Sequence, residues 1–101
     1  MAVANFHFSK KAYRGLDSIW QYTAYRWSRR KANEYYQIIM DTCSRIADNP
    51  MIGSKYLKDN GEYELYFKAK KHFIFYNVVE GEVNIHRILH ENMDLENRLK
   101  E

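Results

Sequence analysis

Residues 28–50 read SRRKANEYYQIIMDTCSRIADNP, and this stretch decides the fold class. Apolar residues recur in it at intervals of three and four, which places them on one face of a helix; they are Ala32, Tyr35, Tyr36, Ile39, Met40, Cys43, Ile46 and Ala47. Ser28 can begin the helix because its hydroxyl accepts a hydrogen bond from a first-turn amide. Asn49-Pro50 ends it because proline cannot continue the backbone hydrogen bonds. The stretch therefore predicts one amphipathic helix.

The residues before this stretch predict a strand and a further helix. Residues 10–27 carry a second apolar stripe at helical spacing, formed by Ala12, Leu16, Ile19, Trp20, Thr23 and Trp27. Ser9 can cap this helix at its N-terminus. So few residues separate the two stripes that the helices must fold back into an antiparallel hairpin. The short apolar and aromatic run from Val3 to Phe8 predicts a strand ahead of the hairpin.

The residues after a turn at 50–53 change from the helical period to the alternation of a strand. Residues 62–68 alternate in this way, which predicts a half-buried strand. Residues 72–79, HFIFYNVV, are almost continuously apolar or aromatic, as in a central strand. Glu80-Gly81 fits a tight hairpin turn, and residues 83–90 alternate again. Three consecutive strands are therefore expected to pair in succession.

These elements predict an α+β fold of the order β-α-α-β-β-β, in a single domain covering residues 1–101. Each element has one apolar face to bury, so the helical hairpin is expected on one face of a mostly antiparallel four-stranded sheet. The remaining sheet surface is expected to stay free for a macromolecular partner. The charged tail from Leu95 to Glu101 predicts one short C-terminal helical turn.

Composition and charge narrow the class of protein. Hydrophobic residues make up 46% and charged residues 29% of the chain, as in a folded protein rather than a disordered one. The formal charge of +3 is a mild bias toward anionic partners. Cys43 is the one cysteine and cannot form an internal disulfide, and no segment has the pattern of a secretory leader. No apolar run approaches the roughly 20 residues that span a bilayer, so we expect a cytoplasmic protein without membrane association.

A series of short strings, each weak alone, follows a fixed order along nearly the whole chain. They are LDSIWQY at 16–22, Arg26-Trp27, Ala32 with Tyr35-Tyr36, NPMIG at 49–53, HFIFY at 72–76 and RILHENMD at 87–94. In order and spacing they resemble the RelE/ParE toxin superfamily, and within it the ParE branch. The chain departs from this pattern at Ser28, where such toxins often carry Gly, and at residues 62–65, EYEL, where relatives commonly carry an Arg.

The resemblance implies the toxin of a type II toxin–antitoxin module, which inhibits DNA gyrase by binding and is neutralised by a ParD-like antitoxin. It implies no cofactor and no catalytic residues. The antitoxin would form a hetero-oligomer with the toxin, and operator DNA would be contacted only indirectly, through the antitoxin. Two alternatives stay open: a RelE-like ribosome-dependent mRNA endonuclease, and a degenerate member that only binds antitoxin.

Two groups of residues are candidates for these contacts. A disordered antitoxin tail that folds on binding is expected to lay a helix on the aromatic residues of the hairpin, which are Tyr13, Trp20, Tyr22, Tyr25 and Trp27. Trp20 and Trp27 share the apolar stripe and fit the core equally well, whereas the three tyrosines lie off it. The target is expected to bind the basic group formed by Lys68, Lys70, Lys71, Arg87 and His90.

The endonuclease alternative assigns chemistry to part of this basic group. RNA cleavage needs an acid, a base and cations on the phosphate, for which the candidates are Lys70, Lys71, Arg87 and His90. Arg87 also alternates with apolar residues of the last strand, which fits a structural role. His86 and His90 would lie about 13 Å apart on a strand, too far to bind one zinc ion together. We therefore expect no metal site.

Overall fold

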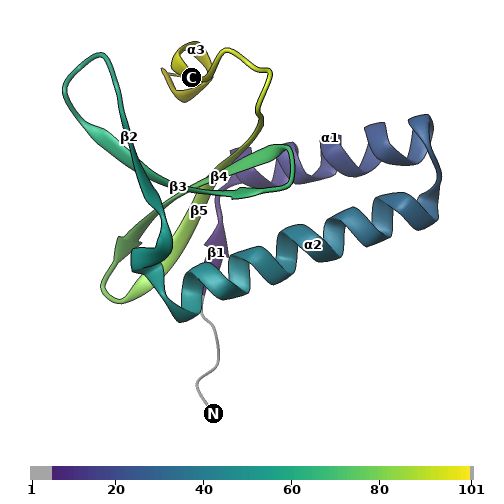
Figure 1. The fold of residues 1–101 in the computed structure, drawn as a ribbon, viewed down its shortest axis with the longest axis horizontal. Coiled ribbons are helices and arrows are strands. Elements are labelled where there is room, and N and C mark those ends of the chain that lie inside the picture. The colour runs from purple at the N-terminus through teal and green to yellow at the C-terminus, as the bar shows by residue number, and fades with distance from the viewer. Residues whose placement is uncertain (1–5, 101) are drawn as a thin grey trace.

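The computed structural model describes residues 6–100 (Figure 1). Along the chain the elements are β1 (Phe6–Phe8), α1 (Lys10–Arg26), α2 (Arg29–Asp48), the 3-10 turn η1 (Pro50–Ile52), β2 (Ser54–Leu57), β3 (Tyr63–Ala69), β4 (His72–Val79), β5 (Glu82–His90) and α3 (Leu95–Lys100). The predicted α+β class, the antiparallel helical hairpin and the mostly antiparallel sheet are confirmed. The part of the expected first strand at residues 3–5, and residue 101 of the expected last turn, lie outside the described residues.

Both helices of the hairpin begin at the serines predicted from the sequence. The Ser9 hydroxyl accepts a hydrogen bond from the Ala12 amide at 3.0 Å, and the Ser28 hydroxyl accepts one from the Lys31 amide at 3.0 Å. These side chains satisfy amides that have no partner inside a helix. The backbone reverses within Trp27 and Ser28, so the two helices run back along each other.

The sheet has the strand order β1-β5-β4-β3-β2, with β1 parallel to β5 and the other neighbours antiparallel. It therefore has five strands, one more than the four that the sequence predicts. The added strand is β2, in which Ser54 pairs with Tyr66 and Leu57 with Tyr63. Its sequence, SKYL, is short and largely exposed, so only its pairing with β3 makes it a strand.

The position of β2 depends on a close contact at Gly53. The Tyr76 hydroxyl donates a hydrogen bond to the Pro50 carbonyl at 2.7 Å and accepts one from the Gly53 amide at 3.0 Å. A β-carbon at Gly53 would lie 2.1 Å from that hydroxyl oxygen. Glycine is therefore required here for space, and the buried tyrosine anchors the turn from α2 into β2.

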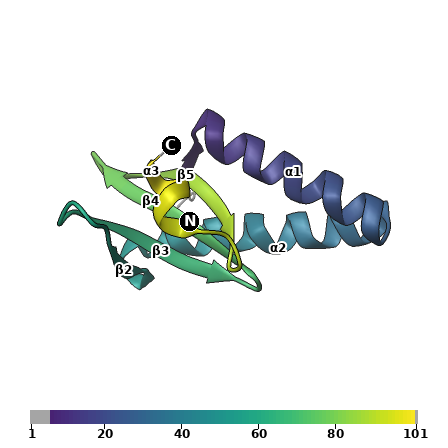
Figure 2. The same ribbon diagram turned by 90° about the horizontal axis from the view of Figure 1, so that it is seen from above.

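The hairpin covers one face of the sheet and then extends past it (Figure 2). The core lies between Ile39, Cys43 and Ile46 of α2 and the strand residues Ile74, Tyr76, Val83, Ile85 and Ile88. Trp27, at the far end of the hairpin, is 69% exposed although it belongs to the apolar stripe. Its position beyond the sheet explains this, because no strand is there to cover it.

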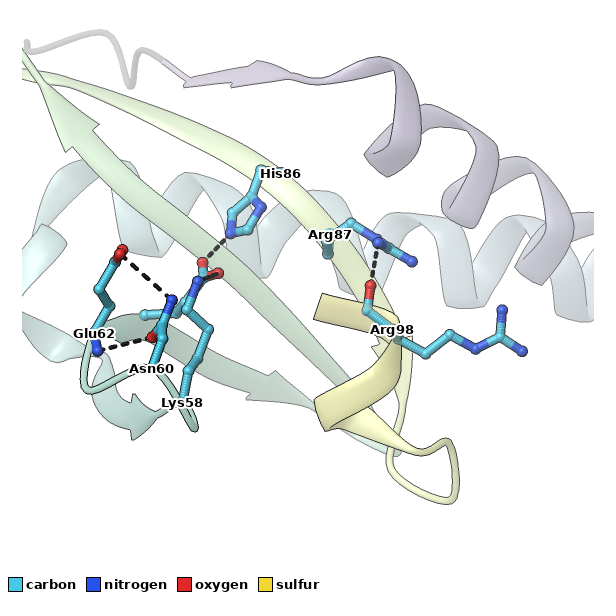
Figure 3. Close-up of polar contacts among 7 residues, drawn as sticks. Lys58, Asn60, Glu62, His86, Arg87 and Arg98 are labelled. Carbon is cyan, nitrogen blue, oxygen red and sulfur yellow. Dashed lines mark hydrogen bonds and ion pairs between the residues drawn. The ribbon is translucent and has the colours of Figure 1, made fainter. Parts of the chain in front are cut away.

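The opposite face of the sheet is partly covered, contrary to the expectation that it stays free. Phe75 is fully buried there, with the rings of Tyr56, Tyr66 and Phe73 around it at centroid distances of 5.8–6.2 Å. The chain then returns over this face as α3 (Figure 3), where Nη1 of Arg87 donates a hydrogen bond to the Arg98 carbonyl at 2.5 Å. An aromatic cluster and a short helix thus occupy much of this surface.

Candidate binding groove

A groove of about 1150 Å³ runs between the helical hairpin and the ends of β4 and β5. One wall comes from α1 and α2, and the other from the β3–β4 turn, the end of β5 and the segment that leads into α3. We call it the hairpin groove. Its size suits a segment of another macromolecule better than a small ligand, since drug-sized ligands occupy about 300–1,000 Å³.

The floor of the hairpin groove is largely apolar. Ile19, Thr23 and Ile38 contribute from the helices, and Ile88 and Leu89 contribute from β5. Gly15 sets how closely α1 approaches β5, because a β-carbon there would lie 3.0 Å from the Ile88 carbonyl oxygen. A larger side chain at this position would push the helix away from the strand and widen the floor.

The rim of the groove concentrates positive charge. Seven of the 16 lysines and arginines line it, and among the acidic side chains that the structure describes only Glu34 does; the cations are Lys11, Arg14, Lys31, Lys70, Lys71, Arg87 and Arg98. Glu34 already lies 3.6 Å from the Lys31 ammonium and 3.8 Å from the Arg30 guanidinium. Elsewhere in the part of the chain that the structure describes there are nine cations and ten carboxylates, so the molecule is polarised, with its basic side at the groove.

Tyr35 and His72 form an uncharged polar pair in the lining of the groove. The Tyr35 hydroxyl lies 2.6 Å from Nδ1 of His72, whose ring packs edge-on against His90 at 5.0 Å. Burial, with a smaller effect of His90, lowers the pKa of His72 to about 4, and Glu91 acts weakly in the other direction. The imidazole is therefore neutral at pH 7, and we assign its Nδ1 as the acceptor of the Tyr35 proton.

Comparison with known proteins identifies the family. Residues 6–95 match the model of a family described as the ParE toxin of the type II toxin–antitoxin system parDE. The chain belongs to the ParE toxin family. It is 31% identical to Toxin ParE1 of Mycobacterium tuberculosis over 97 residues, 95% of this chain and 98% of that protein. It is 30% identical to Toxin ParE1 of Caulobacter vibrioides, over 88% of this chain and 91% of that protein.

The fold of this ParE-family toxin also matches a solved structure. A chain described as part of a chromosomal ParDE system from P. aeruginosa superposes with a TM-score of 0.70, covering 87% of this chain and 96% of that one at 17% identity. This likeness concerns the fold. The resemblance that the sequence strings indicate is thus confirmed, and the protein is the toxin of a type II toxin–antitoxin system.

The structure distributes the five candidate antitoxin-binding aromatics over four places. Tyr22 and Trp27 line the hairpin groove. Trp20 is half-buried between the helices, where its Nε1 donates a hydrogen bond to Oδ1 of Asn33 at 2.9 Å. Tyr13 lies at the other end of α1, against the ring of Phe8, and Tyr25 is 92% exposed near the end of the hairpin. Neither Tyr13 nor Tyr25 lines the groove.

The candidate target-binding residues lie mostly in the same groove. Lys70, Lys71, Arg87 and His90 all line it. Lys68 lies on the other face of the sheet, where its ammonium is 2.5 Å from the Glu91 carboxylate and 5.4 Å from the centroid of Phe73. Two of the five candidate antitoxin contacts and four of the five candidate target contacts therefore share one groove.

Several groove residues carry no clear signal in the sequence. The sequence places Tyr35 on the apolar stripe of a helix and His72 in the central strand. Only the three-dimensional structure shows that the two side chains form a pair. The one available signal is Tyr35 itself, since a tyrosine on a buried stripe needs a partner for its hydroxyl. Arg98 is unpredictable, because it reaches the groove only when the tail folds back over the sheet.

Glu64 lies in the stretch 62–65 where the chain departs from the pattern of the family resemblance, and it is not an isolated negative charge. Its carboxylate contacts Nε2 of His86, and its other oxygen lies 3.4 Å from the Lys58 ammonium. Figure 3 shows His86 and Lys58 close to each other.

Within residues 6–100, no three His, Cys, Asp or Glu side chains are placed to hold a metal ion. None of the described helices is long and apolar enough to cross a bilayer.

Proposed function

We propose that this toxin binds an acidic amphipathic segment of a ParD-like antitoxin in the hairpin groove, and that its cytoplasmic target is DNA gyrase, which it inhibits by binding. The observation that carries the first part is the combination of an apolar floor with seven cations at the rim. An apolar helix face would fill the floor, and carboxylates on its flanks would meet the rim. The P. aeruginosa ParDE structure of the same fold adds support for such a partner.

Tyr22 and Trp27 are the natural anchors for that segment. They are 64% and 69% exposed, and aromatic residues of this kind contribute strongly when a partner covers them. The neutral Tyr35–His72 pair allows an apolar residue to approach without desolvating a charge. Both features favour a protein segment over a phosphate-rich ligand for this groove.

The same geometry suggests how the antitoxin neutralises the toxin. The candidate target contacts Lys70, Lys71, Arg87 and His90 line the groove together with Tyr22 and Trp27. A segment seated on the aromatics would cover the cations as well. Antitoxin and target would then compete for one surface, and no conformational change of the toxin is needed.

Inhibition by binding fits the groove better than RNA cleavage. The His90 ring packs on His72, and its Nδ1 accepts a hydrogen bond from the Asn92 amide at 3.0 Å. Arg87 donates to the Arg98 carbonyl. Two of the four candidate nuclease residues are thus held by structural contacts, and the resemblance to the ParE branch points to gyrase.

The test is to add the purified toxin to a gyrase supercoiling assay and to a coupled translation assay. We expect loss of supercoiling, with translation unaffected and supercoiling restored by an equimolar amount of the antitoxin. The Lys70→Glu/Lys71→Glu variant should lose most of the inhibition, whereas the control Lys10→Glu/Lys55→Glu, with the same charge change at exposed residues outside the groove, should retain it. Blocked translation with intact supercoiling would favour the endonuclease, and inactivity in both assays would favour a degenerate member.

A further inference from the structure

The end of the helical hairpin holds the whole excess charge of the chain. We define the hairpin tip as residues 25–31, YRWSRRK. It contains Arg26, Arg29, Arg30 and Lys31, and the nearest carboxylate along the chain is Glu34. These four cations and one carboxylate leave a net charge of +3, which equals the formal charge of the full chain. Outside residues 25–34 the lysines and arginines equal the aspartates and glutamates, at twelve each.

The hairpin tip projects away from the sheet and is open to solvent (Figures 1 and 2). The side chain of Arg30 is 89% exposed, and Tyr25 is 92% exposed. The guanidinium of Arg26 lies over the ring of Trp27, 5.9 Å from its centroid. Tyr25, Arg26, Arg29 and Arg30 do not line the hairpin groove, so they stay accessible when a partner fills it.

We propose that the hairpin tip binds the phosphate backbone of DNA without sequence specificity. Three of its four cations are arginines, whose planar guanidinium matches the geometry of a phosphate. Backbone binding needs only exposed cations, and the ring of Tyr25, which is exposed and lies outside the groove, can stack on an unpaired base. An acidic protein surface is the competing partner. DNA is favoured because Tyr25, Arg26, Arg29 and Arg30 lie outside the hairpin groove, so its apolar floor does not offer them a place to bury a protein segment.

This DNA contact is additional to the proposed antitoxin and gyrase binding. It is inferred from the side chains of the tip and does not depend on either of those partners. It is also distinct from operator recognition, which needs contacts to base edges. If the toxin inhibits gyrase, the tip would place a second contact on the DNA that the enzyme holds. Binding to naked DNA is measured without gyrase, so the two proposals fail separately.

The experiment is fluorescence anisotropy of a labelled duplex of about 20 base pairs, titrated with the full-length toxin between about 50 and 200 mM NaCl. Neutralising about three phosphates gives a slope of about −2.7 in log K against log salt, which is a loss of about 40-fold over this range. Arg29→Gln/Arg30→Gln should reduce the slope to about −1 and weaken binding about tenfold or more at the lower salt. Circular dichroism should show unchanged folding.

Lys10→Gln/Lys55→Gln is the matched control, because it removes the same charge from exposed residues at other places. It should keep nearly the wild-type slope. Equal weakening in both variants would show that only net charge matters and would overturn the proposal, as would no binding by the wild type at the lower salt. If the tip variant binds DNA like the wild type and loses binding to polyglutamate instead, the partner is an acidic protein and the DNA assignment is wrong.

Discussion

His72 shows how a single half-buried side chain makes this protein sensitive to pH. Its pKa in the folded chain is lowered to about 4, mainly by burial, whereas an unfolded histidine titrates near 6.5. Between these values the unfolded chain binds the proton and the folded chain does not. The stability that depends on a neutral His72 is therefore complete above pH 6.5 and is lost as the pH falls toward 4.

We predict that the free energy of unfolding decreases by about 1 kcal/mol between pH 7 and pH 5, since one proton corresponds to at most about 1.4 kcal/mol per pH unit and solvent screening reduces the effect at the half-buried His72. His72→Gln should remove most of this dependence. Part should remain, because burial also lowers the pKa of His86. Urea denaturation at the two pH values measures both effects. A wild-type stability that does not change between them would contradict the burial of a neutral His72.

Gly53 is the second residue with a specific physical requirement. We predict that Gly53→Ala destabilises the fold by about 1–3 kcal/mol, because the new β-carbon would displace the Tyr76 hydroxyl and disrupt its two hydrogen bonds. In a Tyr76→Phe background part of the clash is gone, so the same substitution should cost less. A double-mutant cycle by thermal unfolding checks this, and strictly additive effects would show that the contact with Tyr76 is not the cause.

At the scale of elements, α2 carries two adjacent isoleucines with different roles, one in stability and one in binding. Ile39 is fully buried in the core, whereas Ile38 is half-buried and lines the groove. We predict that Ile39→Ala costs about 2–5 kcal/mol of stability, whereas Ile38→Ala costs less and weakens antitoxin binding. Denaturation and isothermal titration with the antitoxin distinguish the two. A larger stability loss at Ile38 would mean that the faces of α2 are assigned wrongly.

Helix α1 divides its aromatic residues in the same way. Tyr22 lies on the groove side, and Tyr13 packs on Phe8 outside it. We predict that Tyr22→Ala or Trp27→Ala weakens antitoxin binding by about 1–3 kcal/mol, which is roughly 5- to 150-fold. Tyr13→Ala, an equally exposed tyrosine on the same helix, should change the affinity little. A comparable loss for Tyr13→Ala would place the partner along the outside of α1.

At the scale of the whole molecule, the separation of charge has a kinetic consequence. The basic side contains the groove and the hairpin tip, and most carboxylates lie elsewhere. Such a field steers an acidic partner toward the groove. We predict that the association rate with the antitoxin falls at least tenfold between about 50 and 500 mM NaCl, while the dissociation rate changes little. Stopped-flow fluorescence of Trp27 would report both rates, and a salt-independent association rate would contradict electrostatic steering.

The amino-acid sequence by itself determined most of the elements, their order and the family. Caps at Ser9 and Ser28, the stop at Asn49-Pro50 and the periods of the stripes act over a few residues, so they can be recognised without the fold. The family strings are local in the same sense. The cations at Lys70, Lys71 and Arg87 were also visible as candidates, although their common location was not.

Only the tertiary structure decided what depends on residues far apart in the chain. Ser54–Leu57 became a strand through its pairing with β3, and α3 returned over the outer face of the sheet. Long-range packing also brings Tyr22 and Trp27 into one groove with Lys70, Lys71 and Arg87, and it makes His72 neutral. The physical reason is that local patterns specify backbone period and polarity, whereas burial, charge clustering and pKa values arise from contacts that form only when the chain is packed.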